Sequence, residues 1–458
     1  MSFRPSARRL GALALAAGAA AAAACSSDPD VRGLTAPTAT NAPFLLRYVA
    51  LGNSITAGFQ SNGINDSTQR ASFANLLARA AGVRFAYPSL AGNGCPAPLT
   101  NLLTQARVGG VGASDCPGRS GGTALLNNVA VPGANSFDPT GLGVGTTAGS
   151  IGGYSALTRV ILGNVTQVQK AIQANPTFAS VWIGNNDVLQ FAIGGDTATR
   201  AGTTITNRIT TPANFVSNYA SMVNLLIAGS PGLQGGGAGT AASQPRGVLI
   251  GVVDVTNTPQ IFQLSVFNSA STATGVNAFN PAAFATLRAL FGVGTTRPAT
   301  FTITFNANCN SSQAAVSFQG IAGINASLPA TATTFQFNCA PGTTPSPVLD
   351  DTERAVFVAR VAAYNAYIRA KADSVGFLYY DPNVRLAALK ANGSVLPFIN
   401  LQSTTQPFGG FISLDGVHPS TRTHVLLASD LRDSLNAKYG ASIPAIDTTG
   451  LWTGSATF

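Results

Sequence analysis

Charged side chains are scarce in this sequence, and the few basic ones do not cluster. Only 9% of the 458 residues are charged, and 26 basic against 17 acidic residues give a formal net charge of +9. Three of the arginines, Arg4, Arg8 and Arg9, lie at the extreme N-terminus. Nucleic-acid binding requires a concentrated basic surface. We therefore expect no nucleic-acid partner.

Apolar runs long enough to cross a membrane are also missing. The N-terminal run 10–24 has 15 residues, whereas a spanning helix takes about 20. A basic start followed by a short apolar run and small residues is typical of a secretory signal peptide. Cys25 directly follows a run of six alanines, so the end of the apolar run resembles a bacterial lipobox. We predict a lipoprotein signal peptide over 1–24 with acylation of Cys25; a plain secretory signal cleaved near Cys25 is the alternative.

Both alternatives export the protein. Residues 28–43 are polar and contain proline, and we expect residues 25–45 to form a tether. Ser26 rather than Asp follows Cys25, which favours sorting to the outer membrane. We therefore expect a lipid-anchored protein of the bacterial cell envelope, whose N-terminal anchor makes the membrane a partner.

Cysteine is rare, and its spacing argues against a metal site. Neither Cys-x-x-Cys nor His-Glu-x-x-His occurs, so neither a zinc site nor a redox dithiol is indicated. Four cysteines remain after Cys25, and an even number in an exported chain favours disulfides. We prefer the pairs that close short loops within one segment, Cys95–Cys116 and Cys309–Cys339.

Short apolar runs alternate with helical periodicity between residues 46 and 440. The runs typical of buried strands are 46–51, 83–87, 128–131, 178–183, 247–255 and 377–380. The stretches typical of amphipathic helices are 73–80, 157–175, 212–228, 352–373 and 420–438. Strands that alternate with helices indicate a parallel sheet with right-handed crossovers. We predict one α/β domain over 46–440, with about five parallel strands, and a C-terminal tail over 441–458.

Three stretches interrupt this alternation and are predicted insertions, near 91–126, 191–211 and 258–349. The first is rich in Gly, Pro and Asn and holds two cysteines, which indicates a disulfide-stapled loop. The third contains the alternating segments 300–305 and 334–337. Alternation with period 2 is typical of strands with one buried face. We expect an inserted β-hairpin or a small subdomain there.

Ser54 follows the first apolar run, in Gly52-Asn53-Ser54-Ile55. In an α/β domain the carboxyl end of a parallel strand is the usual place for a ligand. Gly-Asn-Ser is also ordinary turn chemistry, so Ser54 alone predicts little. It gains meaning only if a base and an acid occur elsewhere in the chain.

Histidine occurs only twice, at His418 and His424, which restricts the search for that base. A serine nucleophile needs an imidazole near neutral pH. Asp415 precedes His418 by three residues, with Gly416 between them and Pro419 after, so a compact turn can bring carboxylate and ring together. We predict His418 as base and Asp415 as its orienting acid; an ordinary turn that caps the next helix is the alternative. His424 lies inside a predicted helix without a nearby acid, and we predict a surface position.

Four blocks of this sequence together resemble the SGNH/GDSL hydrolase family. They are Gly52-Asn53-Ser54-Ile55, Gly133 within Val131-Pro132-Gly133-Ala134-Asn135, Gly184-x-Asn186-Asp187, and Asp415-x-x-His418. They occur in the family's order, at predicted strand ends or before the last helix. The resemblance implies a three-layer α/β/α sandwich of flavodoxin-like type and hydrolysis of a carboxylic ester through an acyl-enzyme, with no metal or cofactor.

The resemblance also assigns roles to single residues. Ser54 would be the nucleophile, and its backbone N–H, that of Gly133 and the side-chain amide of Asn186 would form the oxyanion hole. Three donors aimed at developing negative charge are what acyl transfer requires. The sequence departs from the family at Asn53, where Asp is commoner; Asn keeps a hydrogen-bond acceptor.

Three alternatives stay open at this point. Gly118-Arg119-Ser120-Gly121-Gly122 matches the Gly-x-Ser-x-Gly elbow of α/β-hydrolases, but it follows Cys116-Pro117 instead of a buried strand. Phe408 and Phe411 either line an acyl pocket or only pack. A non-catalytic surface lipoprotein that binds glycan or lipid is the alternative function, motivated by the large β-rich insertion and by Asn53. For an enzyme, the substrate would be a small-molecule, lipid or acylated-glycan ester, and we expect a monomer.

Overall fold

The computed structural model describes residues 42–122, 125–141, 154–163, 165–194, 209–234, 245–266, 281–309, 312–340, 348–401 and 403–451. The predicted signal peptide, Cys25 and most of the predicted tether lie outside these residues. Packing begins before residue 46, because Phe44 and Leu45 in the 3-10 helix η2 (Pro43–Leu45) are buried. It also continues into the predicted tail, where Ile443 is buried.

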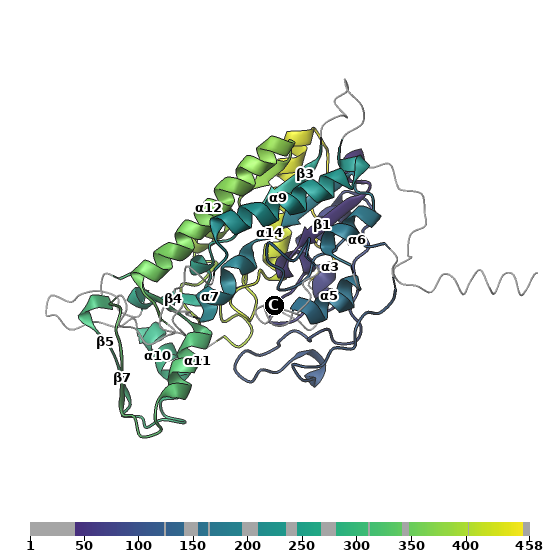
Figure 1. Ribbon diagram of the computed structural model, residues 1–458. Helices are drawn as coiled ribbons and strands as arrows, with labels where there is room; N and C mark the ends of the chain where they lie inside the picture. The colour runs from purple at the N-terminus through teal and green to yellow at the C-terminus, as the bar shows by residue number, and fades with distance from the viewer. Residues whose placement is uncertain are drawn as a thin grey trace, which may run out of the picture.

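The centre of the domain is a parallel four-stranded sheet in the order β1-β2-β3-β9 (Figure 1). Its strands are β1 (Tyr48–Gly52), β2 (Phe178–Trp182), β3 (Gly247–Ile250) and β9 (Leu378–Tyr380). Every residue of β1, β2 and β3 is buried. Strands covered on both faces read as continuous apolar runs, and these runs made them predictable. The α/β class with a parallel sheet is confirmed.

A fifth extended segment lies along the free edge of β1. The Val129 N–H donates to the Ala50 carbonyl at 2.9 Å, and the Val131 N–H donates to the Gly52 carbonyl at 3.1 Å. The predicted strand 128–131 therefore runs parallel to β1, although only Asn128 forms a bridge with Ala50.

The prediction of a strand over residues 83–87 was wrong. These residues join no strand ladder in the described part of the chain. Ala86 instead donates its N–H to the Asn127 side chain at 2.9 Å, while its carbonyl accepts from the N–H groups of Asn127 and Asn128. A side chain thus takes the bond that a neighbouring strand would make.

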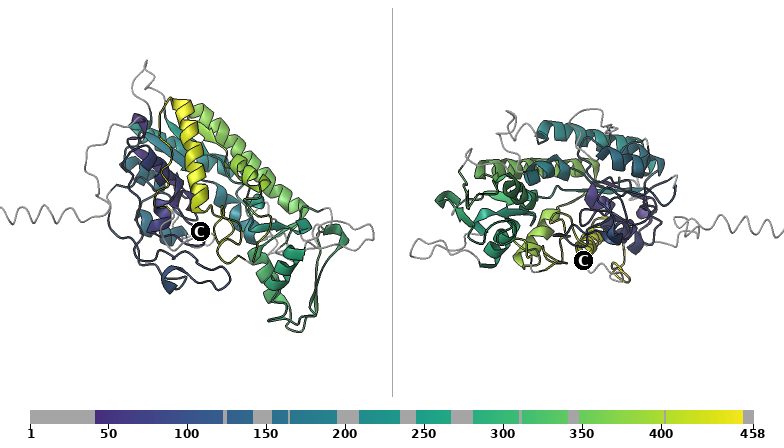
Figure 2. Two further views of the ribbon diagram at one scale, coloured as in Figure 1. Left: turned by 180° about the vertical axis from the view of Figure 1, so that it is seen from behind. Right: turned by 90° about the horizontal axis from the view of Figure 1, so that it is seen from below.

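Helices cover both faces of the sheet. They are α4 (Phe73–Ala80), α6 (Gln167–Gln173), α9 (Pro212–Ala228), α12 (Asp351–Val375) and α14 (Thr421–Tyr439). Alternate residues of β1 pack to opposite sides: Val49 and Leu51 join the core beneath α6, α9 and α12, whereas Tyr48 and Ala50 join the core beneath α4 and α14. α9 and α12 lie nearest the viewer in Figure 1, and α14 lies in front in the view from behind (Figure 2, left). The three-layer sandwich is confirmed.

The helix predicted over 157–175 is two helices. α5 (Tyr154–Leu162) ends before Gly163, which has a φ of +75°. α6 then begins after Thr166, whose side chain accepts from the Gln169 N–H in a capping box. A left-handed residue and a new cap separate the two elements, although the apolar period continues through them.

The third insertion is a small subdomain at one end of the molecule in Figure 1, and its buried side chains share a core with residues of 99–102 and 389–414. It holds the antiparallel sheet β4-β6-β8, with β4 (Ile261–Gln263), β6 (Ala315–Ser317) and β8 (Val348–Leu349). Its other strands, β5 (Thr302–Phe305) and β7 (Thr334–Phe337), pair in parallel. The hairpin alternative was therefore wrong: parallel strands require a crossover, which here includes β6 and α11 (Phe318–Ser327).

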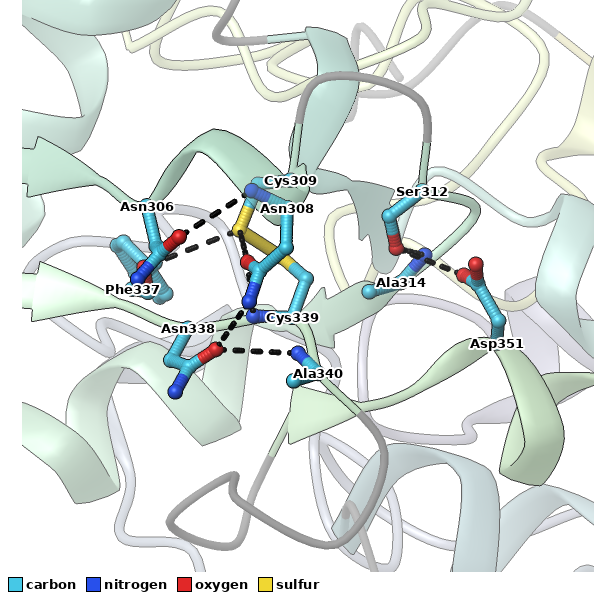
Figure 3. The surroundings of a disulfide bond; sticks show 10 residues. All are labelled: Asn306, Asn308, Cys309, Ser312, Ala314, Phe337, Asn338, Cys339, Ala340 and Asp351. Atoms are coloured by element: carbon cyan, nitrogen blue, oxygen red, sulfur yellow. Dashed lines mark hydrogen bonds between the residues drawn. A yellow bond between two sulfur atoms is a disulfide. The ribbon is translucent and has the colours of Figure 1, made fainter.

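Both predicted disulfides are present, Cys95–Cys116 and Cys309–Cys339. The second joins the segments that follow β5 and β7 (Figure 3). Around it, the Asn308 side chain donates to the side-chain oxygen Oδ1 of Asn338 at 2.6 Å and accepts from the Cys339 N–H at 3.0 Å. Covalent and hydrogen bonds thus hold the same two turns together.

The remaining elements are short. The helices are α2 (Ser54–Ala57), α3 (Asp66–Arg70), α7 (Leu189–Gly194), α10 (Pro281–Leu290) and α13 (Pro382–Ala391). The other 3-10 helices are η3 (Val108–Gly110), η4 (Asn185–Asp187), η5 (Pro231–Leu233), η7 (Val255–Asn257), η8 (Leu264–Val266) and η9 (Ala307–Cys309). Within the described ranges, none of the helices has both the length and the apolarity needed to span a bilayer.

Candidate active site

Ser54 stands at the carboxyl edge of the sheet, as the first residue of α2. Asn53 connects it to β1 and caps the helix, because its side-chain oxygen accepts from the Ile55 N–H at 3.1 Å. Asn53 thus uses the acceptor that it shares with Asp. Its amide nitrogen is buried without a hydrogen-bond partner, and this is the structural consequence of the departure from the usual Asp.

The structure brings Ser54, His418 and Asp415 into one hydrogen-bonded row. Nε2 of His418 lies 2.8 Å from Oγ of Ser54, although the two residues are 364 positions apart. On the other side of the ring, Nδ1 lies 2.9 Å from Oδ2 of Asp415. The ring of Phe59 packs against the imidazole, with 4.9 Å between the ring centroids.

Asp415 is held by backbone and side-chain donors. Its Oδ1 accepts from the N–H groups of Val417 and His418 at 3.0 and 2.8 Å and from the Ser413 hydroxyl at 3.1 Å. Its Oδ2 accepts from the Asn62 N–H at 2.8 Å. Burial alone would raise the pKa of Asp415, but His418 and these bonds lower it to about 2. The carboxylate therefore stays ionised at neutral pH.

Asn62 belongs to a loop whose contact with Asp415 the sequence analysis missed. Ser61 and Asn62 both have a φ of +53°, a left-handed conformation that is uncommon for residues with a side chain. The Ser61 N–H donates to the Ser413 hydroxyl oxygen at 2.9 Å and so fastens this loop to the turn that carries Asp415. The Asn62-Gly63 pair is an ordinary turn signal, but nothing local says what the turn contacts.

Gly133 and Asn186 emerge at the same edge of the sheet. Gly133 follows the segment beside β1 on one side, and Asn186 follows β2 on the other. The φ of Gly133 is +87°, a value that favours glycine. The Asn186 side chain donates to the Ala134 carbonyl at 2.8 Å. An amide nitrogen carries two hydrogens, so one donor remains for a ligand.

A comparison with protein families concerns the part of the chain that contains these residues. The model of the GDSL-like lipase/acylhydrolase family matches residues 48–431. The chain belongs to this family of hydrolases. The match begins at the first residue of β1, ends within α14 and includes all four sequence blocks. Among curated proteins, none matches the chain.

In this GDSL-family hydrolase a buried carboxylate fastens the Gly133 loop. Asp187 accepts from the Ser136 N–H at 2.8 Å and from its hydroxyl at 2.7 Å. Burial raises the pKa of Asp187 to about 6 and that of nearby Asp138 to about 7. Asp187 thus ties the loop after Gly133 to the end of β2. The sequence block that contains Asp187 was recognised, but this contact was not predicted.

His424 is buried, so the prediction of a surface position was wrong. Its Nδ1 accepts from the Phe73 N–H at 3.2 Å, at the start of α4, and its ring stacks on Phe73. Burial lowers the pKa of His424 to about 3, so the ring is neutral. The helix face that carries His424 packs on α4, and this side of α14 is not evident from the sequence.

Ser120, in the competing elbow motif, lacks the setting of a nucleophile. It is exposed, and its hydroxyl lies 3.4 Å from that of Ser89. Both histidines are engaged elsewhere, His418 at Ser54 and His424 at Phe73. The motif therefore carries no catalytic arrangement.

An apolar pocket adjoins Ser54 and His418. Its lining is mostly aliphatic and includes Ile55, Leu189, Val253, Leu386, Leu389 and Leu427. Among the described lining residues Arg385 is the only permanent cation, and it pairs with Asp430, at 2.8 Å between Nε and Oδ2. Phe408 lies in the core of the third insertion and Phe411 packs against that core. Neither lines the pocket, so the packing alternative holds for both.

Proposed function

We propose that the protein is an exported, lipid-anchored serine esterase that cleaves carboxylic esters through an acyl-enzyme on Ser54. The observation that carries the proposal is the approach of the Ser54 hydroxyl to the His418 ring at 2.8 Å, with Asp415 on the far side of that ring at 2.9 Å. Membership of a lipase/acylhydrolase family supports it. Export and anchoring rest on the sequence pattern that ends at Cys25.

In the first step Oγ of Ser54 attacks the ester carbonyl, and His418 Nε2 accepts the hydroxyl proton. A C–O bond forms, and the carbonyl π electrons move onto oxygen. Asp415 accepts from Nδ1–H, so it holds the tautomer that leaves Nε2 free and stabilises the imidazolium that forms.

The negative charge on the former carbonyl oxygen needs donors that are already in place. Ser54 begins a helix, where backbone N–H groups lack intrahelical partners. Its N–H, the Gly133 N–H and the second Asn186 hydrogen are the proposed donors. The bond from Asn186 to Ala134 orients the amide before substrate arrives.

In the second step the tetrahedral intermediate collapses. The bond to the alcohol oxygen breaks, and His418 returns its proton to that oxygen. Water then attacks the acyl-enzyme with His418 again as base, and the acid leaves Ser54 in its starting state. The apolar pocket next to Ser54 suits the acyl chain, because burial of each methylene group stabilises the bound chain by about 0.8 kcal/mol.

The proposal is tested in cells that express the full chain. The protein should be found in the membrane fraction and should incorporate labelled palmitate. A fluorophosphonate probe should label its Ser54, and the purified protein should hydrolyse p-nitrophenyl esters. Cys25→Ser should lose the palmitate and the membrane association but keep the fluorophosphonate labelling. Absence of labelling at Ser54 would favour the binding lipoprotein, and palmitate on Cys25→Ser would contradict the anchor.

Asn186→Ala should lower kcat by about 10²–10³-fold with little change in KM, because the amide acts on charge that exists mainly in the transition state. Steady-state kinetics with p-nitrophenyl butyrate measure the two constants separately. Asn214→Ala, at an exposed position of α9, is the control. A rise in KM at constant kcat would instead make Asn186 a substrate-binding residue.

A further inference from the structure

A second pocket adjoins the same histidine. It is lined by His418 and Asp415 but not by Ser54, and it shares Leu189 and Val417 with the apolar pocket. Its outer walls come from the three insertions: Gln105 from the first, Ile193 from the second, and Gln260, Phe318 and Gln319 from the third. The segments that interrupt the α/β domain thus converge on one cavity beside the catalytic row.

We propose that this second pocket binds the alcohol half of the ester and that this alcohol is a neutral sugar, so that the substrate is an acylated glycan. The inference rests on the proposed esterase function and names its substrate class. Three observations carry it: the position of the pocket relative to Ser54 and His418, the chemistry of its lining, and its charge.

The positions of the two pockets relative to Ser54 and His418 assign one half of the substrate to each pocket. The acyl group stays bonded to Ser54 after the first step, so it occupies the pocket that contacts Ser54. The alcohol oxygen takes its proton from Nε2 of His418, so the alcohol lies on the histidine side. The second pocket has His418 but not Ser54 in its lining, so it is the neighbouring space that the alcohol can enter.

Apart from Asp415 and His418, the second pocket is lined by apolar residues and by four amide side chains, those of Asn62, Gln105, Gln260 and Gln319. An amide offers one acceptor and two donors, which matches hydroxyl groups that both donate and accept. Gln260 is almost completely buried and donates to the Gln319 side chain. The Gln260 N–H also donates to the Gly416 carbonyl at 3.0 Å. This amide pair is therefore tied to the turn that carries Asp415 and His418.

The charge of the pocket argues against a phosphate or carboxylate headgroup. Among its described lining residues there is no Lys or Arg, and the only acid is Asp415. Asp415 is ionised and already accepts hydrogen bonds at both oxygens. An anionic alcohol would meet this carboxylate without a cation to balance it. The half-buried Phe318 ring offers an apolar face to a sugar ring.

The test keeps the acyl group constant and changes the alcohol. Purified mature protein receives p-nitrophenyl butyrate, a butyrylated neutral xylo-oligosaccharide and butyryl-glycerophosphocholine. We expect the sugar ester to have a higher kcat/KM than the phospholipid ester. Gln319→Ala and Phe318→Ala should each lower the ratio of kcat/KM for the sugar ester to that for the p-nitrophenyl ester by about tenfold, the scale of one or two lost contacts.

Gln313→Ala is the matched control, because Gln313 is an exposed glutamine of the same insertion that does not line the pocket. It should keep the wild-type ratio. An unchanged ratio in Gln319→Ala and Phe318→Ala, or a preference for the phospholipid ester, overturns the sugar assignment while esterase activity remains. If wild-type protein hydrolyses none of the three esters, the proposed function itself has failed.

Discussion

Ser54→Ala should abolish ester hydrolysis, with kcat for p-nitrophenyl butyrate falling about 10⁶-fold, as expected when a serine nucleophile is removed. Among the described residues, the Ser54 hydroxyl is the group that lies within hydrogen-bond distance of His418 Nε2, at 2.8 Å. Without it no acyl-enzyme can form. Loss of one small side chain should leave the fold intact, which circular dichroism and thermal unfolding can verify.

The matched control for this prediction is Ser120→Ala. Ser120 lies in the competing Gly-x-Ser-x-Gly motif but is exposed and has no histidine beside it. This variant should keep wild-type kcat and wild-type labelling by a fluorophosphonate probe. Equal activity in Ser54→Ala and wild type would disprove the acyl-enzyme mechanism, and loss of activity in Ser120→Ala would move the nucleophile to the first insertion.

Asp415→Asn should lower kcat by about 10⁴-fold, because the new amide nitrogen would favour the wrong tautomer of His418. The turn itself should survive, since an Asn oxygen can still accept from the N–H groups of Val417 and His418. Asp433→Asn, at an exposed position of α14, is the control. A kcat within tenfold of wild type would show that Asp415 does not orient the histidine.

The same variant should also change the acid stability of the protein. The folded pKa of Asp415 is lowered to about 2, so its ionised form stabilises the fold above the unfolded pKa, near 4, and this contribution is lost as pH falls through 2. The wild type should therefore lose roughly 2 kcal/mol of unfolding free energy between pH 5 and 2 from this group. Urea unfolding across that range should show a flatter pH dependence for Asp415→Asn.

Elements whose limits are set by neighbouring residues could be predicted from the sequence. α9 begins and ends at the predicted residues, 212 and 228, because Thr211 caps its first turn and Pro212 suits its first position. α4 likewise has the predicted limits, 73 and 80. The turn at Asp415 is similar, since its acid and its histidine are only three residues apart.

The failures depend on contacts between distant segments. Residues 83–87 have the composition of a strand, but residues 127–131 occupy the edge of β1. His424 has no acid nearby in the sequence, yet it is buried because α14 packs on α4. Alternation in β5 and β7 was recognised, but which strands pair, and in which direction, depends on the crossover between them.

The sequence by itself determined which residues can carry the chemistry of this hydrolase, because each motif is a short block with its own local structure. Ser54 starts a turn after a strand, and Asp415 and His418 share one loop. Only the tertiary structure decided that these blocks meet. Ser54 and His418 are 364 residues apart in the sequence, yet the sheet and the loop at Asn62 bring Ser54 Oγ and His418 Nε2 to within 2.8 Å of each other. It also decided what surrounds them: three insertions converge on His418 and form a pocket whose walls share no local pattern.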